Sequence, residues 1–223
     1  MGILKRFSKF SFAIGVSLLL VSCSGMQSKE ETYIGKEVFD LPSNYTLKEI
    51  VVKSQKVVGE NADEVKKVVG LMPEKLPSSP GEPTIKVIPT TAGNTGGEEN
   101  SEYTSPVVIN CPDAAAIVTA VQYPSDFDFV ETTGVLYKVC IYPYSKGYRV
   151  YVVGAYTRYI PNKIGQMLTG VVKKFKGTEC ENMTDLNCSW YKLVQRTKKE
   201  FKDAKILELK YPNGNPGSSS ETP

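Results

Sequence analysis

The chain contains no histidine, so catalytic or metal-binding chemistry would have to come from carboxylates, phenols or thiols. Histidine is the commonest general base and metal ligand, and its absence excludes the Ser/His and Cys/His nucleophile systems. Asp126 and Asp128 lie two residues apart, a spacing that lets two carboxylates share a hard cation. No further oxygen donors follow at a fixed spacing. We therefore expect a solvated loop there, with no metal site and no cofactor.

A hydrolase that uses carboxylate chemistry is the least favoured of three functional classes. Glycoside hydrolysis needs a pair of carboxylates, and Asp126, Asp128 or Glu131 could supply one. A chain with 24 acidic residues offers many such pairs, however, so the signal has little specificity. The sequence also lacks a phosphate-binding loop of the Gly-x-x-x-x-Gly-Lys type. We predict that the protein is not an enzyme.

Tyrosine is concentrated in one stretch of the chain. The stretch contains Tyr137, Tyr142, Tyr144, Tyr148, Tyr151, Tyr156 and Tyr159. Aromatic faces stack on sugar rings and phenols bind hydroxyl groups, so Tyr142, Tyr144 and Tyr151 are candidates for a glycan- or peptidoglycan-binding face. Tyrosine also favours strands and pairs across them, so core packing is the simpler interpretation of the same residues.

The N-terminal residues have the layout of an export signal. Lys5, Arg6 and Lys9 precede an apolar run over residues 10–21, and residues 1–22 contain no acid. The run is too short to span a bilayer, which takes about 20 residues. A basic segment followed by a short apolar one is typical of a secretory signal peptide.

The tetrapeptide Leu20-Val21-Ser22-Cys23 resembles the lipobox of bacterial envelope lipoproteins, a resemblance that covers residues 1–25. It implies that residues 1–22 are removed and that Cys23 receives a diacylglycerol and becomes the mature N-terminus. Residue 24 is Ser and not Asp, which by analogy implies an outer-membrane anchor that faces the periplasm. Two or three acyl chains give stable attachment, so the membrane is the first expected partner.

Beyond the leader the charges cancel. The formal net charge is +3, and all of it lies in residues 1–22; the remaining 24 basic residues balance 24 acidic ones. Nucleic-acid binding needs clustered positive charge, so we expect no nucleic-acid partner. A second envelope protein or a second copy of this chain is the expected protein partner.

Four cysteines remain once Cys23 is assigned to the lipid, and outside the cytosol they allow two disulfides in three connectivities. Cys180 and Cys188 bracket a short polar loop, so they are the more favourable local pair, and Cys111 with Cys140 then follows. A zinc site is the rival interpretation. It requires closer cysteine spacing than this chain has.

The first half of the mature chain divides by composition. Residues 23–45 are polar and read as a tether. A helical pair is predicted over residues 46–72, because Thr46 and Glu49 form a capping box and a second helix-capping signal begins at Asn61. Residues 73–105 are a Pro/Gly-rich linker with a short edge strand over 84–88. The pair is too small for its own core. It must pack on the downstream domain, a second copy or a partner, and we favour the partner contact.

Residues 106–212 form the expected main domain, of class α+β. Strands are predicted over 107–110, 135–143, 148–158 and 204–211, and helices over 164–175 and 186–201. Residues 112–122 fit a helix or a strand. If one helix is counted as an insertion, the order of the elements matches the split βαβ, or ferredoxin-like, arrangement, an antiparallel sheet with helices on one face. Residues 213–223 read as a disordered tail.

These patterns favour a lipid-anchored, non-catalytic binding or assembly module of the bacterial cell envelope. The alternative is a glycan-binding module that uses the tyrosines. An outward row of exposed tyrosines would favour the alternative, and a cleft with converging carboxylates would favour a hydrolase.

Overall fold

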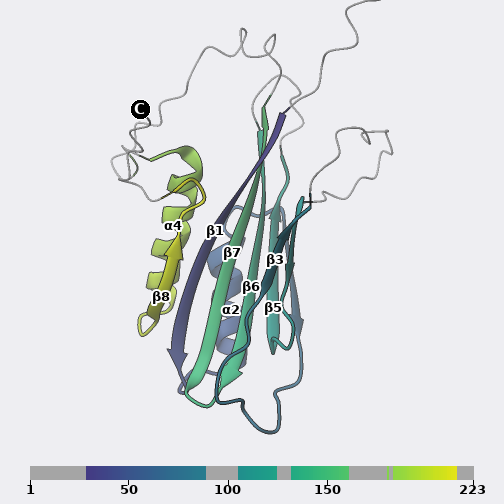
Figure 1. Cartoon of the computed structure of the whole chain (residues 1–223). Helices are drawn as coiled ribbons and strands as arrows, with labels where there is room; N and C mark the ends of the chain where they lie inside the picture. The colour runs from purple at the N-terminus through teal and green to yellow at the C-terminus, as the bar shows by residue number, and fades with distance from the viewer. Residues whose placement is uncertain (1–28, 89–104, 125–131, 161–179, 181–182, 215–223) are drawn as a thin grey trace, which may run out of the picture.

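A computed structural model describes residues 29–88, 105–124, 132–160, 180 and 183–214 (Figure 1). Their elements in chain order are β1 (Lys29–Pro42), α2 (Leu47–Gly59), β2 (Glu64–Val69), β3 (Thr84–Val87), β4 (Val107–Asn110), β5 (Ala116–Gln122), β6 (Thr132–Tyr144), β7 (Gly147–Ile160), α4 (Asp185–Glu200) and β8 (Lys205–Lys210). Six strands form one antiparallel sheet in the order β2-β5-β6-β7-β1-β8, and β3 and β4 form a two-stranded ribbon. The predicted α+β class and antiparallel sheet are confirmed.

The ferredoxin-like arrangement is not confirmed. The sheet has six strands, and β1, the first strand of the chain, lies between β7 and β8. The hairpin predicted over 135–158 is confirmed as β6 and β7, and the predicted strand at 204–211 as β8. The helix predicted over 186–201 is confirmed as α4. The helix predicted over 164–175 and most of the predicted tail lie outside the described residues.

Strand β1 corrects the prediction that residues 23–45 form a tether. It pairs with β7 along its whole length, and Lys36–Asp40 also pair with β8. The alternation that identifies a strand is hard to see in the sequence. Gly35 and Glu37 occupy positions on the same face as Phe39, where apolar side chains would normally stand.

Strand β2 corrects the prediction of a second helix in residues 61–72. Val65, Val68, Val69 and Met72 fit a helical stripe, but residues 64–69 instead pair with β5. Helix α2 itself is confirmed, with the Thr46 hydroxyl accepting a hydrogen bond from the Glu49 backbone N–H at 3.2 Å. Residues 46–72 are therefore not a separate helical pair, because α2 packs on the main sheet and β2 extends it.

The ambiguous stretch 112–122 is resolved in favour of a strand, β5. Asp113 has a φ of 58°, in the left-handed region, which prevents a helix from starting at Pro112. The Pro/Gly-rich segment contributes β3, which pairs with β4 as a ribbon. Its residue Pro77 accepts a hydrogen bond from the Ser145 N–H at 2.9 Å, so this part of the expected linker lies against the sheet.

Two hydrophobic cores form, one on each face of the sheet. Both helices pack on one face through Ile50, Val57, Trp190 and Leu193, among others. The ribbon covers the other face, where Val107 and Ile109 meet side chains of β1, β6 and β7. In Figure 1, α2 lies behind the sheet and β3 in front of it.

Trp190 fixes α4 to the sheet and is fully buried. A Cβ atom added at Gly35 would lie 2.7 Å from its indole ring, and one added at Gly154 would lie equally close. These two glycines, on the adjacent strands β1 and β7, therefore form the seat of the indole.

We predict that Gly35→Ala lowers the free energy of unfolding by about 1–3 kcal/mol, because the added methyl group collides with the Trp190 ring. Gly70→Ala is the matched control, since its new Cβ would lie 3.5 Å from its nearest neighbour and should change stability by less than about 0.5 kcal/mol. Urea unfolding of the mature chain measures both. Equal stability of the two variants would contradict this account of α4 docking.

Candidate functional site

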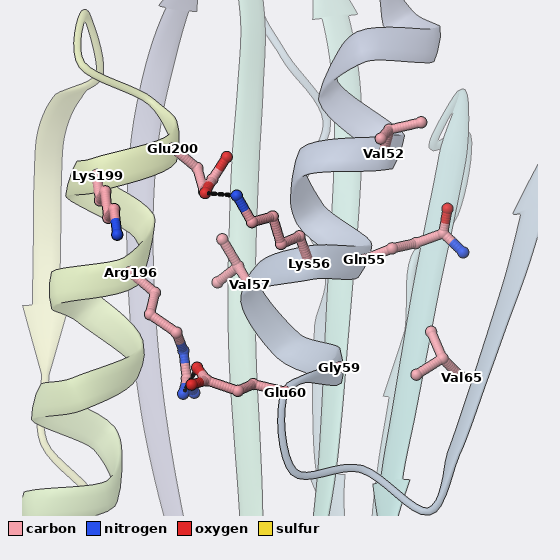
Figure 2. A pocket seen from close by; sticks show the side chains of 10 residues that line it. All are labelled: Val52, Gln55, Lys56, Val57, Gly59, Glu60, Val65, Arg196, Lys199 and Glu200. Carbon is pink, nitrogen blue, oxygen red and sulfur yellow. Dashed lines mark hydrogen bonds and ion pairs between the residues drawn. The ribbon is translucent and has the colours of Figure 1, made fainter.

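A hollow on the described surface lies around the outward side of α2 (Figure 2). It has a volume of about 730 Å³ and is open to solvent. On one side of α2, Lys56 forms an ion pair with Glu200 and Glu60 forms one with Arg196, so both pairs bridge to α4. Val52, Gln55 and Val65 line the hollow on the opposite side of α2.

The charges of the hollow join the two helices. Each bridging cation meets a carboxylate of the other helix, which leaves no convergent group of carboxylates for acid-base chemistry at this place. Exposed ion pairs of this type contribute little stability individually, about 0–1 kcal/mol. The side of α2 that carries Lys56 and Glu60 is therefore held to α4 by ion pairs. The opposite side, with Val65, is an open surface next to β2.

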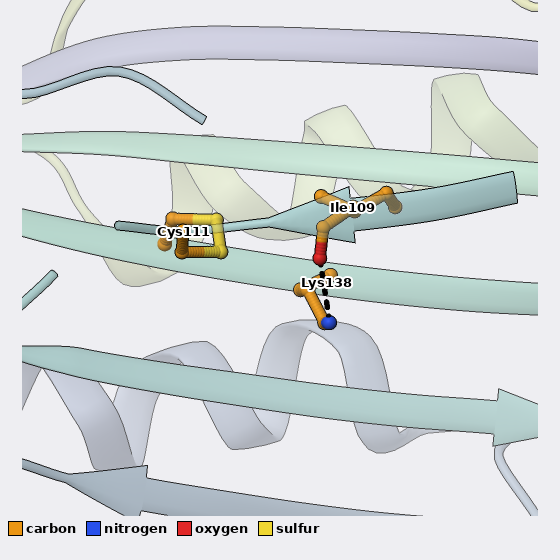
Figure 3. The surroundings of a disulfide bond; sticks show 4 residues. Ile109, Cys111 and Lys138 are labelled. Carbon is orange, nitrogen blue, oxygen red and sulfur yellow. Dashed lines mark hydrogen bonds between the residues drawn. A yellow bond between two sulfur atoms is a disulfide. The ribbon is translucent and has the colours of Figure 1, made fainter. Parts of the chain in front are cut away.

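The second face of the sheet is closed by a disulfide. Cys111, just after β4, is bonded to Cys140 on β6, and the Lys138 ammonium donates a hydrogen bond to the Ile109 carbonyl at 2.8 Å (Figure 3). Burial lowers the pKa of Lys138. The second pair, Cys180 with Cys188, ties the residues before α4 to its first turn. Both predicted pairings are confirmed.

The tyrosines proposed for glycan binding are buried on the face of the sheet that the β3–β4 ribbon covers. Tyr142, Tyr144 and Tyr151 stand on the face away from the helices, as expected, but their exposed fractions are only 1%, 6% and 3%. The backbone at Gly81 lies directly against the Tyr142 ring, and Tyr142 meets Tyr151 edge to face at 5.6 Å. Burial raises the pKa of Tyr142 and of Tyr151. The three tyrosines therefore do not form the exposed platform that glycan binding would need.

The other predicted site residues fall elsewhere. Asp126, Asp128 and Glu131 lie outside the described residues, as does Cys23. Among the residues the structure does describe, no group of three or more Cys, Asp or Glu side chains could hold a metal ion.

One acid is buried without a partner. Glu37 on β1 is fully buried on the helix side of the sheet, and neither of its carboxylate oxygens has a hydrogen-bond partner within the described part of the chain. The neighbouring Thr197 hydroxyl donates instead to the Leu193 carbonyl at 3.2 Å. Burial raises the pKa of Glu37 to about 7, with Thr197 and the charge of Lys198 opposing the rise, and Tyr211 is the other titratable group nearby. Glu37 is therefore a pH-sensitive point of the core.

Five exposed apolar side chains lie close together in one piece of the chain, which we name the distal apolar strip. It comprises Val68, Val69, Leu71, Met72 and Leu76, in β2 and the segment that follows. Leu71 is 95% exposed. Exposed apolar surface of this kind on a folded protein marks a site of contact with another molecule, so the strip is the candidate functional site.

The strip lies far from the start of β1. A row of paired residues runs across the sheet from Val69 on β2 to Phe39 on β1, through Ala116, Ile141 and Val150. Val69 and Phe39 therefore lie at the same height along the sheet. Phe39 comes ten residues after Lys29, which at about 3.3 Å per residue corresponds to about 33 Å along the sheet. The chain after β2 continues to the lower end of the sheet in Figure 1, opposite to the end at which β1 begins.

Comparison with protein-family models, with curated proteins and with solved structures finds no match for this chain. Among the described residues, neither helix is long and apolar enough to cross a membrane.

Sequence reasoning missed both Glu37 and the strip. No alternation of apolar and polar residues marks the segment around Glu37, and the glutamate itself made it appear polar. The valines of the strip were assigned to the buried face of a helix, whereas in a strand at the sheet edge they meet solvent.

We predict that Glu37→Gln removes one component of the pH dependence of stability. The carboxyl pKa is raised on folding from 4.5 to about 7, so the native state holds the proton more tightly. The contribution of protonated Glu37 to the free energy of unfolding is therefore fully present below pH 4.5. It falls by about 3 kcal/mol in total as the pH rises to about 7.

The measurement is urea unfolding of both proteins between pH 4 and pH 8, with Glu74→Gln, at an exposed position, as the control. The wild-type protein should lose stability relative to Glu37→Gln across this range, and the control should follow the wild type. Parallel curves for the wild type and Glu37→Gln would show that Glu37 titrates normally.

Proposed function

We propose that this protein is a lipid-anchored, non-catalytic binding module of the bacterial cell envelope, held at the outer membrane through Cys23 and facing the periplasm. Its partner is another envelope protein. The observation that supports the proposal is the distal apolar strip, which exposes five apolar side chains to water within one short piece of chain.

The chain length between the anchor and the fold supports this arrangement. Cys23 precedes Lys29, the first residue of β1, by six positions, so the connection spans at most about 22 Å. The end of the sheet where β1 begins is therefore held close to the bilayer. The strip lies about 33 Å further along the sheet, a position suited to a partner in the periplasm rather than to the anchoring membrane.

The two disulfides support export of the chain. Disulfides persist in oxidising compartments and are rare in the cytosol, and both pairs here join described segments. The Cys111–Cys140 bond also holds the ribbon over the tyrosines, so no observation favours the glycan-binding alternative.

The proposal predicts two results in cells. Cys23→Ala should move the protein from the membrane fraction to the soluble periplasmic fraction or leave it unprocessed, because the acyl anchor is lost. A photo-crosslinking residue at position 71 of the wild-type chain should give one discrete adduct in intact cells, whereas the same residue at the exposed position Lys146 should give none.

Each result has an outcome that contradicts the proposal. Membrane fractionation of Cys23→Ala that equals the wild type would overturn the lipid anchor. The absence of an adduct from position 71 would overturn the binding role of the strip, and an adduct with the mass of two copies would replace the foreign partner by self-association.

A further inference from the structure

The free edge of strand β2 exposes unpaired backbone groups beside the strip. Among the strands that the structure describes, β2 is the last of the six-stranded sheet and pairs only with β5. The Gly70 N–H donates to the Ala115 carbonyl at 2.8 Å, on the β5 side. Because backbone groups point alternately to the two sides of a strand, those of Val65, Lys67 and Val69 point outward. The outer edge therefore offers a row of donors and acceptors.

We propose that this edge binds an extended segment of a partner protein, which adds to the sheet as a strand next to β2. Strand addition of this kind uses main-chain hydrogen bonds for affinity and alternate side chains for specificity. The inference deepens the proposed function by naming the edge and the chemistry of the segment it binds. It depends on the lipid anchor only for the compartment in which the partner is found.

The side chains of β2 define what the segment must carry. Val65, Lys67 and Val69 project to the same face of the sheet as α2, because Val65 pairs with Ala120 of the helix-side core. Val52 of α2 lines the same open side of the hollow as Val65 and is itself exposed (Figure 2). The face thus presents two valines with a lysine between them. A matching segment has apolar residues opposite the valines and a carboxylate opposite Lys67.

The lysines argue against a second copy of β2 as the occupant. Two copies of β2 could pair antiparallel in only a few registers that join at least five of the six residues of each strand. Every one of these registers places Lys66 or Lys67 directly opposite a lysine of the other copy. Like charges directly opposite one another destabilise a strand pair, and edge lysines are a recognised protection against self-pairing. A foreign segment with acidic residues has no such conflict.

The strip extends the contact beyond the strand. Leu71, Met72 and Leu76 follow β2 in the chain and remain exposed. They give the partner segment apolar contacts past the point where β2 ends at Val69. The bound segment is therefore longer than β2 itself and is apolar toward one end.

The test uses the mature chain without lipid and a short capped peptide that carries valine, glutamate and valine at every second position, with threonine between them, so that the glutamate shares one face with both valines. A peptide with lysine in place of glutamate is the control for charge. We expect the acidic peptide to bind and the basic peptide to bind at least about tenfold more weakly. Equal binding of the two peptides would overturn the proposed charge recognition.

Two variants at one position separate the backbone from the side chain. Lys67→Pro removes an outward N–H that β5 does not use, and edge strands tolerate proline, so it should weaken binding of the acidic peptide by about tenfold or more. Lys67→Ala keeps the N–H and should weaken binding less. Equal effects of the two substitutions, or none from Lys67→Pro, would overturn strand addition.

Amide hydrogen exchange on the wild-type chain gives a readout independent of whether Lys67→Pro folds. Addition of the acidic peptide should protect the amides of Val65, Lys67 and Val69. Unchanged exchange at saturating peptide would overturn the inference. If the peptide binds but the Cys23→Ala variant still fractionates with membranes, only the lipid anchor is overturned. If position 71 gives an adduct but the peptide does not bind, only the strand addition is overturned.

Discussion

The pairing of β1 with β7 is the constraint on which the rest of the structure depends. All fourteen residues of β1 pair with β7, and Lys36–Asp40 also pair with β8, which has no other neighbour among the described strands. Gly35 and Gly154 meet across this ladder and form the seat of Trp190. Without β1, α4 would lose half of that seat, and the helix-side core would lose Phe39 and Leu41.

The pairing of β1 with β7 also determines which surfaces of the protein remain open. The sheet is covered by helices on one face and by the disulfide-linked ribbon on the other, and β1 occupies the position beside β7 where another strand could otherwise add. Among the described strands, β2 and β8 form the two edges of the sheet, and exposed apolar side chains continue past the β2 edge. The binding role that we propose for the β2 edge uses a surface that this arrangement leaves open.

Local signals in the sequence predicted the elements they govern. Strict alternation identified the β6–β7 hairpin, the Thr46 cap identified α2, and cysteine spacing identified both disulfides. The failures occurred where tertiary contacts override local pattern. Gly35 and Glu37 belong to a strand because Trp190 and α4 cover them, and nothing near them in sequence shows this. The valines of β2 fit two periodicities equally well, and only pairing with β5 selects the strand. The face of Tyr142 was predicted correctly, but its cover comes from a segment whose composition indicates a linker.

Amide hydrogen exchange of β1 in the mature chain tests the central claim most directly. If β1 closes the sheet, the amides between Ile34 and Leu41 that bond to neighbouring strands should exchange only through global unfolding, with the same protection as those of Val150 to Tyr156 on β7. Exchange of the β1 amides at the rate of an unstructured chain, while β7 remains protected, would show that this segment is a tether and would contradict the account.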